Sequence, residues 1–163
     1  MKHLTIVLVL CTQLGFSQID FPEWSVETKL QHKIGYTNFE LRYGRPSVRE
    51  RKIMGQVVPY DRLWRTGAGK GTTIAFDKPV VISDKTLAAG TYAFVTIPGE
   101  NEWTILINTD TTKIYGDPGE YDAATEVLRF NVKPEKSCRF YETFTIGLDH
   151  KLGDAVLFMA WEN

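Results

Sequence analysis

Apolar side chains recur at every second position in short stretches of this chain, and that alternation limits what it can fold into. Val26, Leu30 and Ile34 are apolar while their immediate neighbours are charged or polar, and residues 39–43 repeat the pattern. A period of two sends alternate side chains to opposite faces of an extended strand, whereas an amphipathic helix needs a period near 3.6. We therefore expect pleated layers rather than helices.

Turn-forming residues divide the chain into about nine expected strands. These cover residues 26–34, 39–43, 72–76, 80–82, 91–97, 103–108, 128–132, 140–148 and 155–161. Residues 109–122 lack alternation and are expected to form a long surface loop. The last segment is almost continuously apolar, which is typical of a central strand buried on both faces. The sequence predicts an all-β fold, either a single-domain antiparallel β-sandwich or a jelly-roll-like barrel.

The first residues have the composition of a secretory signal peptide. Lys2 and His3 precede an apolar run over residues 4–14, which is too short to cross a bilayer, and Ser17 ends a small-x-small cleavage site. We expect a signal peptide over residues 1–17 and one domain over residues 18–163, exported to the periplasm or secreted. Leu10 precedes Cys11 where lipoprotein processing prefers a small residue, so acylation of Cys11 is not expected.

The charge balance and the scarcity of metal-binding residues argue against several classes of function. Lys and Arg total 19 and Asp and Glu total 20, which gives no electrostatic footprint for nucleic acid. No segment of the expected mature chain is apolar for long enough to be transmembrane. His32, His150 and Cys138 do not suffice for a metal site, and no cofactor is expected. We expect His32 to face inward and Cys138 to be a buried structural thiol.

The segment over residues 45–70 combines arginines with aromatic rings. It holds seven basic residues against two acidic ones: Arg45, Arg49, Arg51, Lys52, Arg62, Arg65 and Lys70 against Glu50 and Asp61. Guanidinium groups present a fork of donors suited to oxyanions, and flat rings suit sugars. A connection of this length is uncommon unless it is functional or folded over the core. We expect Arg45, Tyr60, Trp64 and Arg65 to line a concave end of the sandwich that binds a small anionic molecule or glycan.

Two other functions are consistent with the same residues. Apolar side chains of this segment are suited to sealing one end of the sandwich, which would suit a structural or protein-interaction domain of the cell envelope. A hydrolase would need a pair of carboxylates, whose separation depends on the fold. Whether the protein is an enzyme is therefore left open by the sequence.

Glycines at the end of this segment suggest a phosphate-binding loop, but the match fails. The first glycine of that motif would fall at Trp64. The motif also leads into a helix, whereas residues 72–76 are β-type. Nucleotide binding is not expected.

Several short blocks of the chain occur in the order of one known family. They are RPSV (45–48), RKI (51–53), VPY (58–60), LWRTGA (63–68), AGTY (89–92), IPG (97–99) and WT (103–104). From about Trp24 to Trp161 the chain resembles the exported bacterial family known as domain of unknown function 2911 (DUF2911). The resemblance implies a leader followed by one such domain, and it brings no known reaction, ligand or catalytic residue.

The chain departs from that family's pattern at one point. After Trp-Arg-Thr-Gly-Ala the family usually continues Asn-Glu-Ala-Thr, whereas this chain has Gly69-Lys70-Gly71-Thr72. Lys70 reverses the local charge. If the usual acidic residue takes part in a family activity, this chain is expected to lack that activity.

Overall fold

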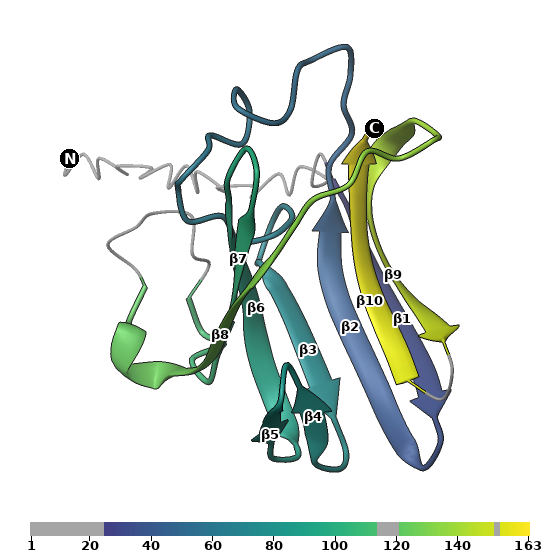
Figure 1. The fold of residues 1–163 in the computed structure, drawn as a ribbon, viewed down its shortest axis with the longest axis vertical. Coiled ribbons are helices and arrows are strands. Elements are labelled where there is room, and N and C mark those ends of the chain that lie inside the picture. The colour runs from purple at the N-terminus through teal and green to yellow at the C-terminus, as the bar shows by residue number, and fades with distance from the viewer. Residues whose placement is uncertain (1–24, 114–120, 152–153) are drawn as a thin grey trace, which may run out of the picture.

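The computed structural model describes residues 25–113, 121–151 and 154–163, so the expected signal peptide over residues 1–17 and much of the expected long loop lie outside the described residues. The described part contains ten strands and one short 3₁₀ turn (Figure 1). The elements are β1 (Val26–Ile34), β2 (Thr37–Arg45), β3 (Thr72–Phe76), β4 (Val80–Ile82), β5 (Lys85–Leu87), β6 (Gly90–Pro98), β7 (Trp103–Asn108), η2 (Ala123–Thr125), β8 (Glu126–Val132), β9 (Tyr141–Lys151) and β10 (Asp154–Glu162).

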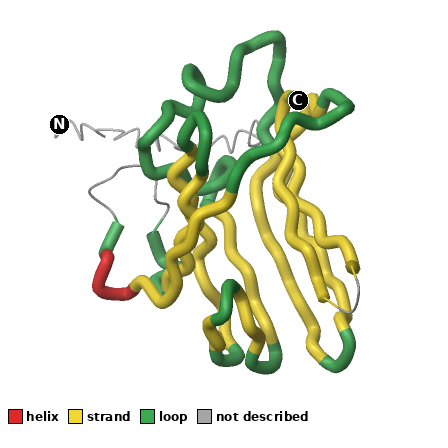
Figure 2. Tube along the Cα trace, in the orientation of Figure 1, coloured by secondary structure: helices red, strands yellow, loops and turns green. Residues whose placement is uncertain are grey.

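The strands form one large antiparallel sheet and two hairpins. The sheet has the order β1-β2-β3-β6-β7-β8, while β4 pairs with β5 and β9 pairs with β10. The expected all-β class is confirmed, and the sheets are open rather than closed into a barrel (Figure 2). No helix in the described ranges is long and apolar enough to cross a membrane.

The period-two pattern produces one buried and one solvated face on β2. Phe39, Leu41 and Tyr43 point into the core and are at most 5% exposed. On the opposite face, Glu40 pairs with Lys29 of β1 at 2.9 Å and with Arg42 at 2.7 Å. The hydrogen bonds from Arg42 and Lys29 lower the pKa of Glu40 to about 2. Alternation therefore decides which face of this part of the sheet meets the core.

The hairpin of β4 and β5 contains a strand that the sequence did not indicate. Ser83 and Asp84 connect the two strands with φ values of 47° and 65°. Two consecutive left-handed residues are the geometry of a type I′ turn, whose usual sequence signal is Asn-Gly or Asp-Gly. Ser-Asp is an unusual pair for this turn, so residues 83–85 suggested only the end of a strand.

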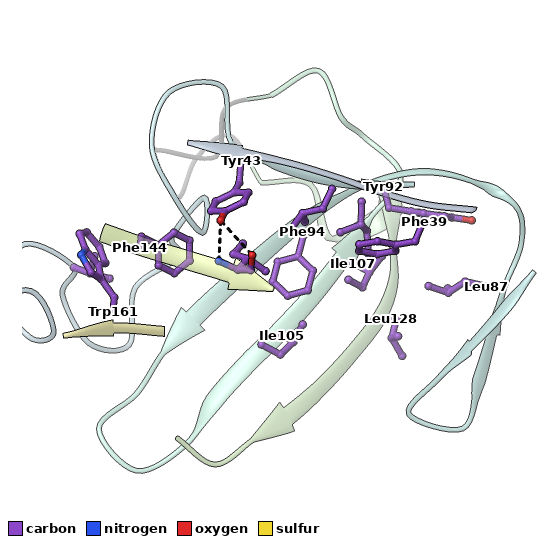
Figure 3. Packing of buried hydrophobic residues seen from close by; sticks show 14 of the residues in the cluster. Phe39, Tyr43, Leu87, Tyr92, Phe94, Ile105, Ile107, Leu128, Phe144 and Trp161 are labelled. Atoms are coloured by element: carbon purple, nitrogen blue, oxygen red, sulfur yellow. Dashed lines mark hydrogen bonds between the residues drawn. The ribbon is translucent and has the colours of Figure 1, made fainter. Parts of the chain in front are cut away.

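The hairpin of β9 and β10 joins the large sheet through side chains of β2. The Tyr43 hydroxyl accepts a hydrogen bond from the backbone N–H of Ile146 (3.0 Å) and donates one to the carbonyl of the same residue (3.2 Å), as drawn in Figure 3. Two residues further along β2, the Arg45 guanidinium donates to the Phe144 carbonyl at 3.1 Å. Side chains of β2 thus occupy backbone groups on the free edge of β9.

Beyond the end of β2, backbone groups rather than side chains bond to the edge of β9. The Phe144 N–H donates to the Pro46 carbonyl at 2.9 Å, and Ser47 forms an antiparallel bridge with Thr143. The chain therefore passes from the large sheet directly onto the edge of β9. The core lies between the inner face of the sheet and the two hairpins (Figure 3).

The prediction of a central strand buried on both faces at the C-terminal end of the chain is wrong. Among the described residues β10 pairs with β9 alone, and Val156 and Phe158 are 43% and 40% exposed. Phe158 lies opposite Gly147 of β9, where a Cβ atom would overlap its ring. The apolar residues of this run therefore have two different roles. Trp161 and every second residue before it pack inward, whereas Phe158 faces outward and covers Gly147.

Two further expectations about burial are also wrong. His32 does share a strand face with Leu30, but β1 is the edge strand of the sheet and the imidazole is exposed. Cys138 is a free, exposed thiol in the connection before β9. Strand parity set the direction of His32, and the position of the strand at the edge set its exposure.

Replacing Tyr43 with Phe tests the link between β2 and β9. Y43F leaves the buried N–H and carbonyl of Ile146 without their partner, so we expect the free energy of unfolding to fall by about 1–3 kcal/mol. Urea denaturation measures this change. The matched variant Y92F removes one bond to the carbonyl of the exposed Ala88 and should have a smaller effect. Equal losses in the two variants would contradict the role given to Tyr43.

Candidate ligand-binding cleft

The connection between β2 and β3, called here the basic loop (residues 46–71), folds back over one end of the large sheet. The backbones of Trp64 and Thr96 exchange two hydrogen bonds, at 2.7 and 3.0 Å. The Asp61 N–H donates to the Pro98 carbonyl at 2.8 Å. The loop therefore continues the pairing of β6 beyond the sheet and is fixed in place by it.

The basic loop is also tied to the C-terminal hairpin. The Val48 N–H donates to the Glu142 carbonyl at 2.7 Å. The Glu162 carboxylate accepts hydrogen bonds from the N–H groups of Ile53 and Met54, at 3.0 and 3.2 Å. Val48 and Ile53 are buried at this junction. Part of the loop thus seals the core, as the structural interpretation of the sequence expected.

The rest of the basic loop frames an open cleft of about 530 Å³. Four of the residues that line it are arginines: Arg49, Arg51, Arg62 and Arg65. No Asp, Glu, His or Cys is present among the described lining residues. The described lining of the cleft therefore carries cationic side chains and no acidic one.

Aromatic rings form the inner part of the cleft. Trp64 of the loop and Trp161 of β10 both line the cleft. Their rings stack with a distance of 6.0 Å between ring centroids and an interplanar angle of 14°. Edge-to-face contacts hold Trp64 against Phe144 at 5.0 Å and Trp103 at 6.2 Å. The stack spans the loop, the hairpin and the sheet, so these rings are fixed in orientation.

The arginines differ in how strongly the protein holds them. Arg51 donates to the carbonyls of Val48 and Ser47, at 3.0 and 2.7 Å, and Arg65 donates to the Gly69 carbonyl at 3.1 Å. A guanidinium has five N–H donors, so both keep donors for a ligand. Arg62 is exposed and makes no hydrogen bond or ion pair within the described residues.

The structure brings together two of the four residues that the sequence singled out. Trp64 and Arg65 line the cleft, whereas Arg45 and Tyr60 are not among its described lining. Arg45 also donates to the hydroxyls of Thr143 and Thr145, at 3.0 and 3.1 Å, so its guanidinium is occupied on β9. The ring of Tyr60 lies against Gly55, where a Cβ would be 2.9 Å from the ring.

Sequence reasoning missed Arg49, Arg51, Arg62 and Trp161 as site residues. The three arginines belong to the basic segment, and alternation could not rank them because loop residues have no fixed period. Trp161 lies about a hundred residues further along the chain, and no local signal connected it with the loop.

The glycine-rich end of the loop lies against β2. A Cβ at Gly44 would overlap the Ala68 carbonyl oxygen, so glycine is required where the two backbones meet. The loop then enters β3, as expected from residues 72–76. Lys70 is absent from the described cleft lining and lies with Glu27 and Arg42 at a separate shallow depression.

A second cluster of titratable groups is found away from the cleft, beside β8. The Tyr121 hydroxyl donates to Glu126 at 2.6 Å, and Arg129 forms two hydrogen bonds with the same carboxylate, at 2.9 and 2.8 Å. Burial and the neighbouring carboxylate raise the pKa of Tyr121. Arg129 lowers the pKa of Glu126. These bonds join the loop before η2 to β8, which is a structural role.

No group of three or more potential metal ligands occurs among His, Cys, Asp and Glu in the described part of the chain. A family model described as protein of unknown function (DUF2911) matches residues 25–163. Comparison with the curated proteins and with the solved structures finds no match.

Replacing Gly44 with Ala tests the close approach of β2 to the glycine-rich end of the loop. The added methyl group displaces the backbone at Ala68, so G44A should lower the free energy of unfolding by about 1–3 kcal/mol. Thermal unfolding checks this. G90A is the matched control, because a Cβ at Gly90 would meet the Tyr92 side chain at an ordinary distance of about 3.4 Å. A G44A protein as stable as G90A would show that the two backbones do not need this contact.

Proposed function

The chain belongs to the DUF2911 family of proteins of unknown function, and we propose that it binds a small anionic molecule in the cleft framed by the basic loop. One observation carries the proposal: four arginines line one cleft, and no acidic side chain accompanies them among the described lining residues. Surface arginines are usually neutralised by nearby carboxylates or spread over a solvated face. Their convergence on one concavity is what a carboxylate, phosphate or sulfate requires.

The stacked indoles support a ligand that carries more than a bare charge. Trp161 is largely buried in its stack, and the partly exposed Trp64 indole is the flat apolar surface of the lining against which a sugar ring or another ring can lie. A volume of about 530 Å³ is within the usual range for small-molecule sites. An acidic sugar or a small phosphorylated or sulfated molecule combines both features, a charge for the guanidinium groups and a ring for the indoles.

The proposed setting is outside the cytoplasm, as the signal peptide expected over residues 1–17 implies. The ligand would then be a molecule of the periplasm or of the surroundings of the cell.

The hydrolase and the protein-interaction domain each need a feature that the described cleft does not have. A hydrolase of the carboxylate type needs two acidic groups facing the ligand, and the described lining supplies none. A protein-docking surface needs a contiguous apolar patch beside the arginines. Val57, at 43% exposure, is the one exposed large apolar side chain in the described lining. Anion binding is the function that the described side chains favour.

The variant R62A tests the proposal, because Arg62 is exposed and its loss should not disturb the fold. We expect inorganic phosphate, sulfate or glucuronate to raise the melting temperature of the purified protein, and neutral glucose to raise it less. R62A should keep the melting temperature of the unliganded protein while weakening binding of the best anion about tenfold, as for a charged hydrogen bond. Calorimetric titration measures the affinity.

K33A is the matched control. Lys33 is an exposed cation at one end of β1, and Ser25, which lines the cleft, precedes the other end of that strand. K33A should bind the anion as the unsubstituted protein does. Failure of every anion to bind, or equal affinity in R62A, would contradict the proposal. Stronger binding of neutral glucose than of glucuronate would point instead to recognition by the indoles alone.

A further inference from the structure

One side-chain polar atom in the described part of the chain is buried without a hydrogen-bond partner, and it belongs to a residue that lines the cleft. It is the indole nitrogen Nε1 of Trp161. Trp161 as a whole residue is 8% exposed, and it is among the residues that line the cleft. Buried donors almost always find an acceptor, because leaving one unpaired loses the hydrogen bond it made with water.

Packing alone does not account for an indole at this position. The Trp161 ring stacks on Trp64 and contacts Phe144 at 5.5 Å, and both contacts use the carbon framework of the ring. A phenyl ring would fill much of that space without burying an unpaired N–H. The indole N–H is thus buried where no hydrogen bond within the described residues uses it.

The surroundings of this donor indicate what its missing acceptor is. The described lining carries four arginines and no carboxylate that could act as an acceptor. An oxygen of an incoming anion is therefore the acceptor best suited to this site. Oxyanions carry several oxygens, so one group can accept from an indole N–H and from guanidinium groups together.

We propose that Trp161 Nε1 donates a hydrogen bond to an oxygen of the bound anion and makes the cleft selective for oxyanions such as phosphate, sulfate or a carboxylate. The proposal rests on the anion-binding function given above and adds its innermost contact. Because Nε1 is shielded from solvent, the oxygen reaches it only when the atoms that cover it shift. Binding should therefore change the environment of the Trp161 indole directly.

The variant W161F removes the N–H and keeps an aromatic ring at the centre of the stack. We expect W161F to bind inorganic phosphate and sulfate about tenfold more weakly, the usual effect of losing a hydrogen bond to a charged group. W103F is the matched control: Trp103 also packs edge-to-face on Trp64 but is absent from the described cleft lining. It should retain the affinity for both anions.

A spectroscopic measurement separates ligand contact from a loss of packing. Amide-type ¹H–¹⁵N spectra resolve the four tryptophan indole N–H groups, and the resonance that W161F lacks identifies Trp161. Titration with phosphate should shift this resonance more than the Trp103 resonance. A W161F protein that loses affinity while the Trp161 resonance of the unsubstituted protein stays fixed would show a packing role and overturn the inference.

The two proposals fail in different ways. If phosphate or sulfate binds and R62A weakens it while W161F binds equally well, the inference about Trp161 is wrong and the anion site stands. If neither anion nor glucuronate binds the unsubstituted protein, both proposals are wrong.

Discussion

The bonding of β2 to the free edge of β9 holds the two parts of this fold together. A two-stranded hairpin such as β9–β10 is marginally stable by itself in water, so it depends on what it docks against. Tyr43 and Arg45 supply that support by bonding backbone groups of Ile146 and Phe144. The backbone of β2 keeps its own pairing within the sheet while its side chains make these bonds. The bonds supply partners for backbone groups of β9 that would otherwise be buried without them.

The same junction creates the cleft. Once β2 reaches the edge of β9, the following residues must cross between sheet and hairpin, and the basic loop is held on both sides. Thr96 fixes Trp64 from the sheet, and Glu162 fixes the loop backbone from the hairpin. The arginines therefore belong to a loop whose conformation is fixed by contacts between residues far apart in the sequence. Rigid placement of this kind lowers the entropy that a binding site loses when it holds a ligand.

Sequence patterning predicted most strands but misjudged what surrounds them. Residues 155–161 form a strand, yet their apolar composition suggested a central position that β10 does not have. Composition reports how much apolar surface a strand carries, and it does not say which element covers each face. The same difficulty affected the site. Arg45 and Arg65 look alike in the sequence, but Arg45 has an edge of β9 to bond and Arg65 faces the cleft.

By itself the sequence determined the all-β class, the position of most strands along the chain and the segment in which the cationic side chains gather. These follow from local physics: alternation sets the strand face, and turn residues set where the chain reverses. Only the tertiary structure decided that Trp161 meets Trp64 and which arginines converge. Contacts between residues about a hundred positions apart leave no periodic trace in the sequence, because they depend on how complete elements pack together.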